Sequence, residues 1–129
     1  MRQMVSRRFG LLVGMAGASG VVLGAFGTHA LRAVLDAPHA EIWHTAVNYH
    51  VWHALALALA VGLGTGRSQR VAIVAFAAGI VLFSGSLYAL ALGAPRWIGI
   101  ITPFGGLGFI AGWMALGLSL TSRESNPRP

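Results

Sequence analysis

Four long stretches without a single charged side chain constrain the fold of this chain more than any other feature. They cover residues 9–30, 45–64, 71–92 and 98–120. A helix needs about 20 residues to cross the ~30 Å hydrocarbon core of a bilayer. Backbone groups in lipid must be hydrogen-bonded within the protein, which favours helices, and the alternating pattern of a membrane β-barrel is absent. The sequence therefore predicts an all-α fold, an integral membrane four-helix bundle forming a single transmembrane domain over residues 1–129, with short polar tails at 1–8 and 121–129.

The composition excludes several other classes of protein. Hydrophobic residues make up 56% of the 129 residues and charged residues 9%, whereas soluble domains carry roughly a quarter charged residues. The chain has no cysteine, so disulfides, thiolate zinc sites and iron–sulfur clusters are excluded. The net charge is +6, but no basic stripe interleaved with aromatic residues is present, and we expect no nucleic-acid partner.

The arginines are distributed unevenly over the segments between the apolar stretches. The tails and the second loop carry most of them: Arg2, Arg7, Arg8, Arg67, Arg70, Arg123 and Arg128. The first and third loops carry only Arg32 and Arg96. Because short cytoplasmic loops are enriched in Lys and Arg, this pattern predicts an up-down-up-down bundle with both termini cytoplasmic.

The first apolar stretch has a second interpretation, as a cleaved signal peptide. It is longer than the roughly 7–15 residues of a signal-peptide core, and its small residues do not mark one cleavage site. We expect it to remain as the first membrane helix.

Small residues at a spacing of four indicate close helix packing. The pairs are Gly10 with Gly14, Gly20 with Gly24, and Gly108 with Gly112. Such pairs let helix backbones approach closely, and we expect contacts within the bundle rather than a dedicated dimer face. Pro38 and Pro95 are expected in the loops, and Pro103 predicts that the fourth helix starts late or bends.

Polar side chains gather in one half of the predicted bundle, towards the outside. Three of the five histidines lie in residues 43–63, at His44, His50 and His53. The predicted topology brings other polar residues to a similar depth, so we expect a candidate polar cluster or ligand site formed by His29, His50, His53, Ser84, Ser86, Tyr88 and Thr102. Ionisable groups inside a membrane usually face the protein interior.

Three interpretations of this cluster stay open. The histidines can be structural, because an interhelical His–Ser or His–Tyr hydrogen bond stabilises helix association. They can bind a metal or haem, for which His29, His50 and His53 would be the ligands. They can also bind a proton, a quinone or another small ligand. No hydrolytic motif such as His-Glu-x-x-His is present, so we predict no catalytic residues and no enzyme activity.

Four motifs carry a resemblance to a known family. They are Gly24-Ala-Phe-Gly-Thr-His-Ala-Leu, Thr45-Ala-Val-Asn-Tyr-His-Val-Trp-His-Ala-Leu-Ala-Leu, Leu82-Phe-Ser-Gly-Ser-Leu-Tyr and Ile101-Thr-Pro-Phe-Gly-Gly. In this order, over roughly residues 9 to 120, the chain resembles the family of small four-helix membrane proteins typified by bacterial YgdD, whose eukaryotic relatives are called transmembrane protein 256. The family's first motif usually has Ala where this chain has Thr28.

The resemblance implies an integral inner-membrane protein with four helices, and it implies no activity, because the molecular function of the family is unknown. The motifs carry most of the polar cluster, whereas His44 falls at a variable-looking position. We expect a structural or accessory membrane component, with the lipid bilayer, a membrane-protein partner or a second copy as its contacts and with no cofactor. The alternative is small-ligand, metal, haem or quinone binding at the outer-half histidines, and a solute or proton transporter is the weakest candidate.

Overall fold

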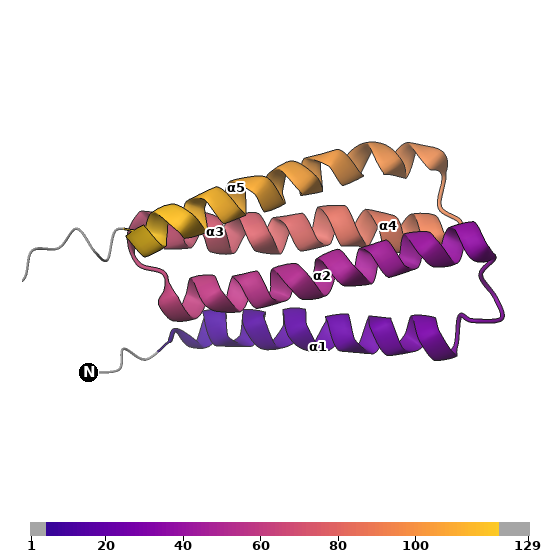
Figure 1. Ribbon diagram of the computed structural model, residues 1–129, viewed down its shortest axis with the longest axis horizontal. Helices are drawn as coiled ribbons and strands as arrows, with labels where there is room; N and C mark the ends of the chain where they lie inside the picture. Colours follow the sequence, from indigo (N-terminus) through magenta and orange to yellow (C-terminus); the bar gives the residue numbers. More distant parts are fainter. Residues whose placement is uncertain (1–4, 122–129) are drawn as a thin grey trace, which may run out of the picture.

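Four long helical segments form a bundle in the computed structural model, which describes residues 5–121 (Figure 1). The first is α1 (Arg7–His29) and the second is α2 (Ala37–Leu63). The third runs without a break through α3 (Gly66–Gly79), η1 (Ile80–Ser84) and α4 (Gly85–Ala91), and the fourth through η2 (Arg96–Ile100) and α5 (Ile101–Thr121). All four are long and apolar enough to cross a membrane.

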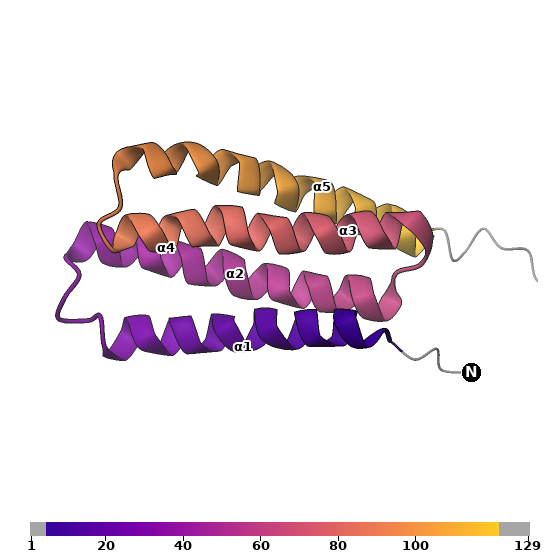
Figure 2. The ribbon, with the colours of Figure 1, turned by 180° about the vertical axis from the view of Figure 1, so that it is seen from behind.

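The loops fall at the two ends of the bundle. The loops at 30–36 and 92–95 lie together at one end, which we call the Pro95 end (Figures 1 and 2). The short α2–α3 connection lies at the opposite end, the Thr65 end, beside the start of α1 and the end of α5. Gly66 and Gly93 have φ of 72° and 99°, a backbone conformation that glycine adopts without a steric penalty.

The second helix begins earlier than the charge-free stretch suggests. Asp36 caps its N-terminus, accepting a 3.0 Å hydrogen bond from the His39 backbone N–H, and Pro38 occupies the first turn. The expectation that Pro38 lies in a loop is therefore wrong, because a proline in the first turn of a helix removes an N–H that has no helical partner anyway. The polar residues His39, Glu41 and His44 therefore lie in the first two turns of α2.

Proline also marks the start of the fourth segment. Pro95 precedes the single 3₁₀ turn of η2, and the backbone becomes α-helical from Ile101. Pro103 therefore lies in the first turn of α5, and helical structure begins before it rather than late.

The main hydrophobic core lies between α2, the third segment and α5. Its centre is made by Leu57, Phe76 and Phe109, which are almost completely buried. Close approach of the third segment to α5 depends on glycine: a Cβ at Gly112 would lie 2.6 Å from the Phe76 ring in α3, and one at Gly105 would collide with the backbone of Phe83 in η1. The expected packing role of Gly112 is thus seen inside the bundle.

Helix α1 packs broadly only against α2 and covers one side of this core with partly buried apolar side chains, Phe9, Leu12, Val13 and Ala16. Gly20 is its one buried residue. Gly24 and Gly27 also face α2, where added Cβ atoms would meet Val47 and Trp43, whereas nothing lies within 4 Å of a Cβ at Gly10 or Gly14. One small-residue pair of α1 is thus used within the bundle and the other is open.

Candidate functional site

His53 is held in a closed network between α2 and α5. Its Nδ1 lies 2.6 Å from the Tyr49 carbonyl oxygen, and its Nε2 lies 3.1 Å from the Trp113 indole nitrogen. A carbonyl only accepts and an indole N–H only donates, so His53 is neutral with its proton on Nδ1. The ring also stacks on Phe109, with 3.5 Å between ring centres. Both nitrogens are therefore occupied, which gives His53 a structural role in this arrangement.

His50 is held differently, between α1 and α4. Its Nδ1 lies 2.9 Å from the Tyr88 hydroxyl, and its Nε2 lies 3.1 Å from the Ser19 hydroxyl and 3.0 Å from the Ala16 carbonyl oxygen. Hydroxyls can donate or accept. With the proton on Nε2, the ring donates to Ala16 and accepts from Tyr88. With the proton on Nδ1, the Nε2 lone pair would face the Ala16 carbonyl oxygen at 3.0 Å, and both are acceptors. His50 is therefore neutral with its proton on Nε2, and the Ser19 hydroxyl donates to the Ala16 carbonyl oxygen at 3.1 Å.

The remaining predicted residues lie in separate contacts. Ser84 donates to the Ala46 carbonyl oxygen at 2.7 Å, and Ser86 lies 2.5 Å from the Thr102 hydroxyl. His29 ends α1 and is exposed, and its imidazole forms no hydrogen bond with any residue in 5–121. Within that range no three His, Asp or Glu side chains lie close enough to hold a metal ion. The structure thus distributes the predicted cluster over several pairwise networks and leaves His29 outside them.

The π-helical turn η1 positions the polar residues of the third segment. It ends at Ser84, which faces α2 and is completely buried. One turn after Ser84, the Tyr88 hydroxyl bonds His50, which also lies on α2. Ser86, between Ser84 and Tyr88 in the sequence, bonds α5 instead. π-Helical turns are rare and frequently occur at functional sites.

An apolar groove of about 400 Å³ passes beside His50, within the ~300–1,000 Å³ range of small-molecule sites. It lies between α1 and the third segment, which do not pack broadly on each other. Met15 and Val81 are 70% and 69% exposed, so the groove opens on the side of the bundle. Its lining residues are Leu12, Met15, Ala16, Ser19, His50, Leu57, Ala77, Ile80, Val81, Gly85 and Tyr88.

Two partners in these networks were not predicted. Ser19 is the one polar side chain in the first span before Thr28, and this isolation was a usable signal. The second partner is Trp113 on α5, whose indole N–H donates to His53. No sequence pattern distinguishes such a tryptophan from one in an interfacial aromatic belt.

The fold and its buried polar pairs define a small multi-pass α-helical membrane protein. The chain belongs to the family described as "Protein of unknown function (DUF423)", whose profile matches residues 23–106. It is 43% identical over 101 residues to the UPF0382 membrane protein YwdK of Bacillus subtilis, covering 74% of this chain and 81% of the relative.

Two further relatives extend the comparison. The UPF0382 inner membrane protein YgdD of Escherichia coli is 39% identical over 116 residues, covering 85% of this chain and 86% of the relative. The UPF0382 membrane protein SH2409 of Staphylococcus haemolyticus is 44% identical over 98 residues, covering 74% and 80%. No solved structure matches the chain. The protein is accordingly an integral protein of the bacterial inner membrane, from a family of unknown molecular function.

Proposed function

We propose that this protein is a non-enzymatic accessory component of the inner membrane that holds a lipid-soluble molecule in the groove beside His50. The observation that carries the proposal is the position of His50 and two hydroxyls that lie within hydrogen-bond distance of its ring, Ser19 and Tyr88, at the wall of an otherwise apolar groove. Neutral imidazole and hydroxyl groups bind an uncharged head group that donates or accepts hydrogen bonds. A quinone carrying an apolar chain has this chemistry, since its carbonyl oxygens accept and its tail fits an apolar wall.

The test uses the full chain in mild detergent and decylubiquinone as the probe. Quenching of tryptophan fluorescence is a suitable readout, because the Trp43 ring lies 4.7 Å from the Tyr88 ring. We expect saturable quenching that weakens several-fold in Tyr88→Phe. Ser86→Ala is the matched control, because it also removes one hydroxyl from α4. The Ser86 hydroxyl bonds α5 and does not line the groove. Quenching that never saturates, or that is equal in the two variants, would refute the groove site.

The orientation in the membrane is part of the same proposal. We place the Thr65 end in the cytoplasm, with both termini there and the segments crossing up-down-up-down, because the tails and the α2–α3 connection carry most of the arginines. The natural chain has no cysteine, so an introduced one is unique. In intact spheroplasts a membrane-impermeant maleimide should label Ala33→Cys and leave Thr65→Cys unlabelled until the membrane is broken. The reverse pattern would overturn this orientation.

A protein partner or a second copy is a further candidate role, favoured by the open face of α1. A Cβ at Gly10 or Gly14 would meet nothing within 4 Å, and small residues at this spacing let a second helix approach closely. Gly14→Leu should reduce the size of a complex purified in mild detergent if the face is used. An unchanged elution volume would assign Gly14 to the lipid surface.

A further inference from the structure

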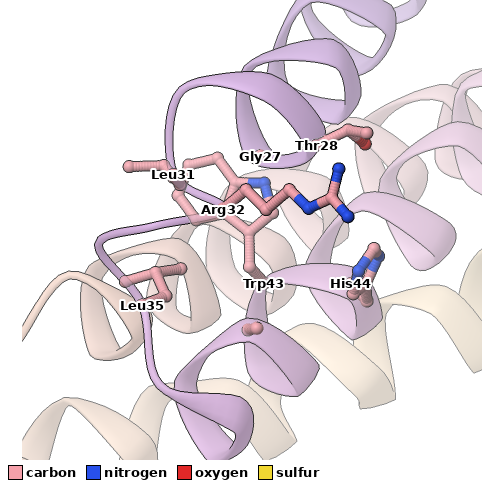
Figure 3. A pocket seen from close by; sticks show the side chains of 8 residues that line it. Gly27, Thr28, Leu31, Arg32, Leu35, Trp43 and His44 are labelled. Carbon is pink, nitrogen blue, oxygen red and sulfur yellow. The ribbon is translucent and has the colours of Figure 1, made fainter.

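A second pocket lies where the end of α1 meets the first turns of α2 (Figure 3). It has a volume of about 210 Å³. Gly27 and Trp43 contribute to its apolar lining, while Arg32 and His44 bring polar nitrogens to it. In Figure 3 the Arg32 guanidinium lies between Thr28 and the His44 ring. None of the predicted cluster residues lines it.

The two basic side chains of this pocket have no partner in residues 5–121. Arg32 and His44 form neither a hydrogen bond nor an ion pair within that range. Asp36 is already bonded to His39, at 2.6 Å, and Glu41 forms no ion pair with Arg32. No carboxylate lines the pocket. A guanidinium beside a pocket without a counter-charge provides a binding position for an anion.

The apolar part of the pocket is fixed by the contacts of Trp43. The Trp43 indole N–H donates a 3.0 Å hydrogen bond to the Leu23 carbonyl oxygen, and the ring packs against Tyr88. Gly27 makes room for the indole, since a Cβ there would collide with its nitrogen. The Thr28 hydroxyl donates to the Gly24 carbonyl oxygen at 3.1 Å. This wall is therefore formed before any ligand binds.

We propose that this pocket binds a phosphate group, with the Arg32 guanidinium as the principal ligand and the His44 imidazole as a second donor. Arg pairs with phosphate through two parallel N–H···O bonds. The phosphate can belong to the head group of an anionic phospholipid or to a soluble anion. The apolar lining beside the guanidinium suits the glycerol and upper acyl region of a lipid. This inference stands on the pocket and its charges, and it does not depend on the ligand proposed for the groove.

The test measures binding to the full chain in mild detergent, with dioctanoyl phosphatidylglycerol and inorganic phosphate as the two probes and the melting temperature as the readout. We expect at least one probe to give a saturable rise in melting temperature. In Arg32→Gln the affinity should fall about tenfold or more, as expected for loss of a charge-assisted bidentate contact. A smaller loss is expected in His44→Gln.

The matched control is Arg96→Gln. Arg96 also lies at the Pro95 end and removing it changes the net charge equally, but it does not line the pocket. Saturation by the lipid alone would assign the site to a head group, whereas saturation by both probes would assign it to soluble phosphate. The proposal is overturned if neither probe saturates, or if Arg96→Gln weakens binding as much as Arg32→Gln does. Arg32 makes no intramolecular bond in residues 5–121, so the melting temperature of Arg32→Gln without probe should equal that of the natural chain.

Discussion

The indole N–H of Trp113 on α5 donates a 3.1 Å hydrogen bond to Nε2 of His53 on α2. This bond, with the one from Nδ1 to the Tyr49 carbonyl, gives His53 a single neutral tautomer. A histidine in this state joins two helices and has no lone pair free for a metal ion. The polar groups in the bundle interior at this point are thus paired with one another.

Removing the His53 side chain should destabilise the protein. His53→Ala removes the ring that stacks on Phe109 and leaves the Trp113 indole N–H unpaired, so we expect a loss of about 2–4 kcal/mol in the free energy of unfolding. Unfolding in a graded detergent mixture measures it. Trp113→Phe removes the donor but keeps a ring, and should cost less, near the ~0.6 kcal/mol average for hydrogen bonds between membrane helices. A His53→Ala protein as stable as the natural chain would contradict the structural role.

The state of His53 also leads to a prediction about cofactors. Protein purified in mild detergent should show no Soret band, because both ring nitrogens of His50 and of His53 are hydrogen-bonded. It should also hold less than one copper or zinc per chain, because no three potential ligands lie together in residues 5–121. Absorption spectroscopy with elemental analysis checks this. A stoichiometric metal that disappears in His50→Ala would show that the histidine networks rearrange around a ligand.

Glycine substitutions in α5 should separate close packing from open surface. An added Cβ at Gly105 collides with Phe83, whereas one at Gly117 meets nothing within 4 Å. We expect Gly105→Ala to cost about 1–3 kcal/mol, as overpacked cores do, and Gly117→Ala to be neutral or slightly stabilising. Thermal unfolding of the two variants gives the comparison. Equal melting temperatures would mean that η1 and α5 can move apart without a penalty.

Ser119 should be needed to hold the α2–α3 connection against α5. Its hydroxyl accepts a 2.7 Å hydrogen bond from the Thr65 N–H and donates a 3.0 Å bond to the Thr65 carbonyl, and the side chain is completely buried. Ser119→Ala leaves both backbone groups without this partner, and we expect a loss of about 1–3 kcal/mol. Thr121→Val is the control, since the Thr121 hydroxyl bonds only within its own helix. If the two variants unfold alike, the contact with Thr65 contributes nothing measurable.

The cap of α2 should produce an acid-dependent loss of stability. The backbone and side-chain hydrogen bonds from His39 lower the pKa of Asp36 below its ordinary value of 3.8. A carboxyl whose pKa is lowered by folding stabilises the folded state above that ordinary value, and the contribution is lost as the pH falls through the lowered pKa. Melting temperatures at pH 7 and pH 3 should therefore differ less in Asp36→Asn than in the natural chain. Glu41→Gln, which removes an exposed carboxylate from the same helix, is the control and should retain the full difference.

The number and approximate position of the helices could be predicted from the sequence, because an apolar stretch of about twenty residues without charge is long enough to cross a bilayer as a helix. It missed the first turns of α2, although Asp36 followed by Pro38 is a recognisable helix start. It also grouped His50 with His53. Residues three apart on a helix differ by about 60° around its axis, and α2 lies between other helices, so one imidazole reaches Tyr88 and the other Trp113.

Other parts of the site had no signal in the sequence. The π-helical turn at Ile80–Ser84 lies in an apolar run that is equally compatible with a regular α-helix. The pocket at Arg32 depends on where the end of α1 lies against α2. That position is set by the close contact of the Trp43 indole with Gly27. Arg32 and His44 are twelve positions apart and could be brought together only by the folded loop.

Helix α1, which packs broadly only on α2, provides one wall of both the groove and the Arg32 pocket. A molecule that binds either site only when α1 is docked stabilises the docked state. By thermodynamic linkage, a ligand in one site then raises the affinity of the other site for its ligand, and the second ligand raises the affinity for the first by the same factor. The two proposed sites would then be reciprocal through the first helix: an anion at the membrane edge and a molecule within the bilayer would each report on the presence of the other.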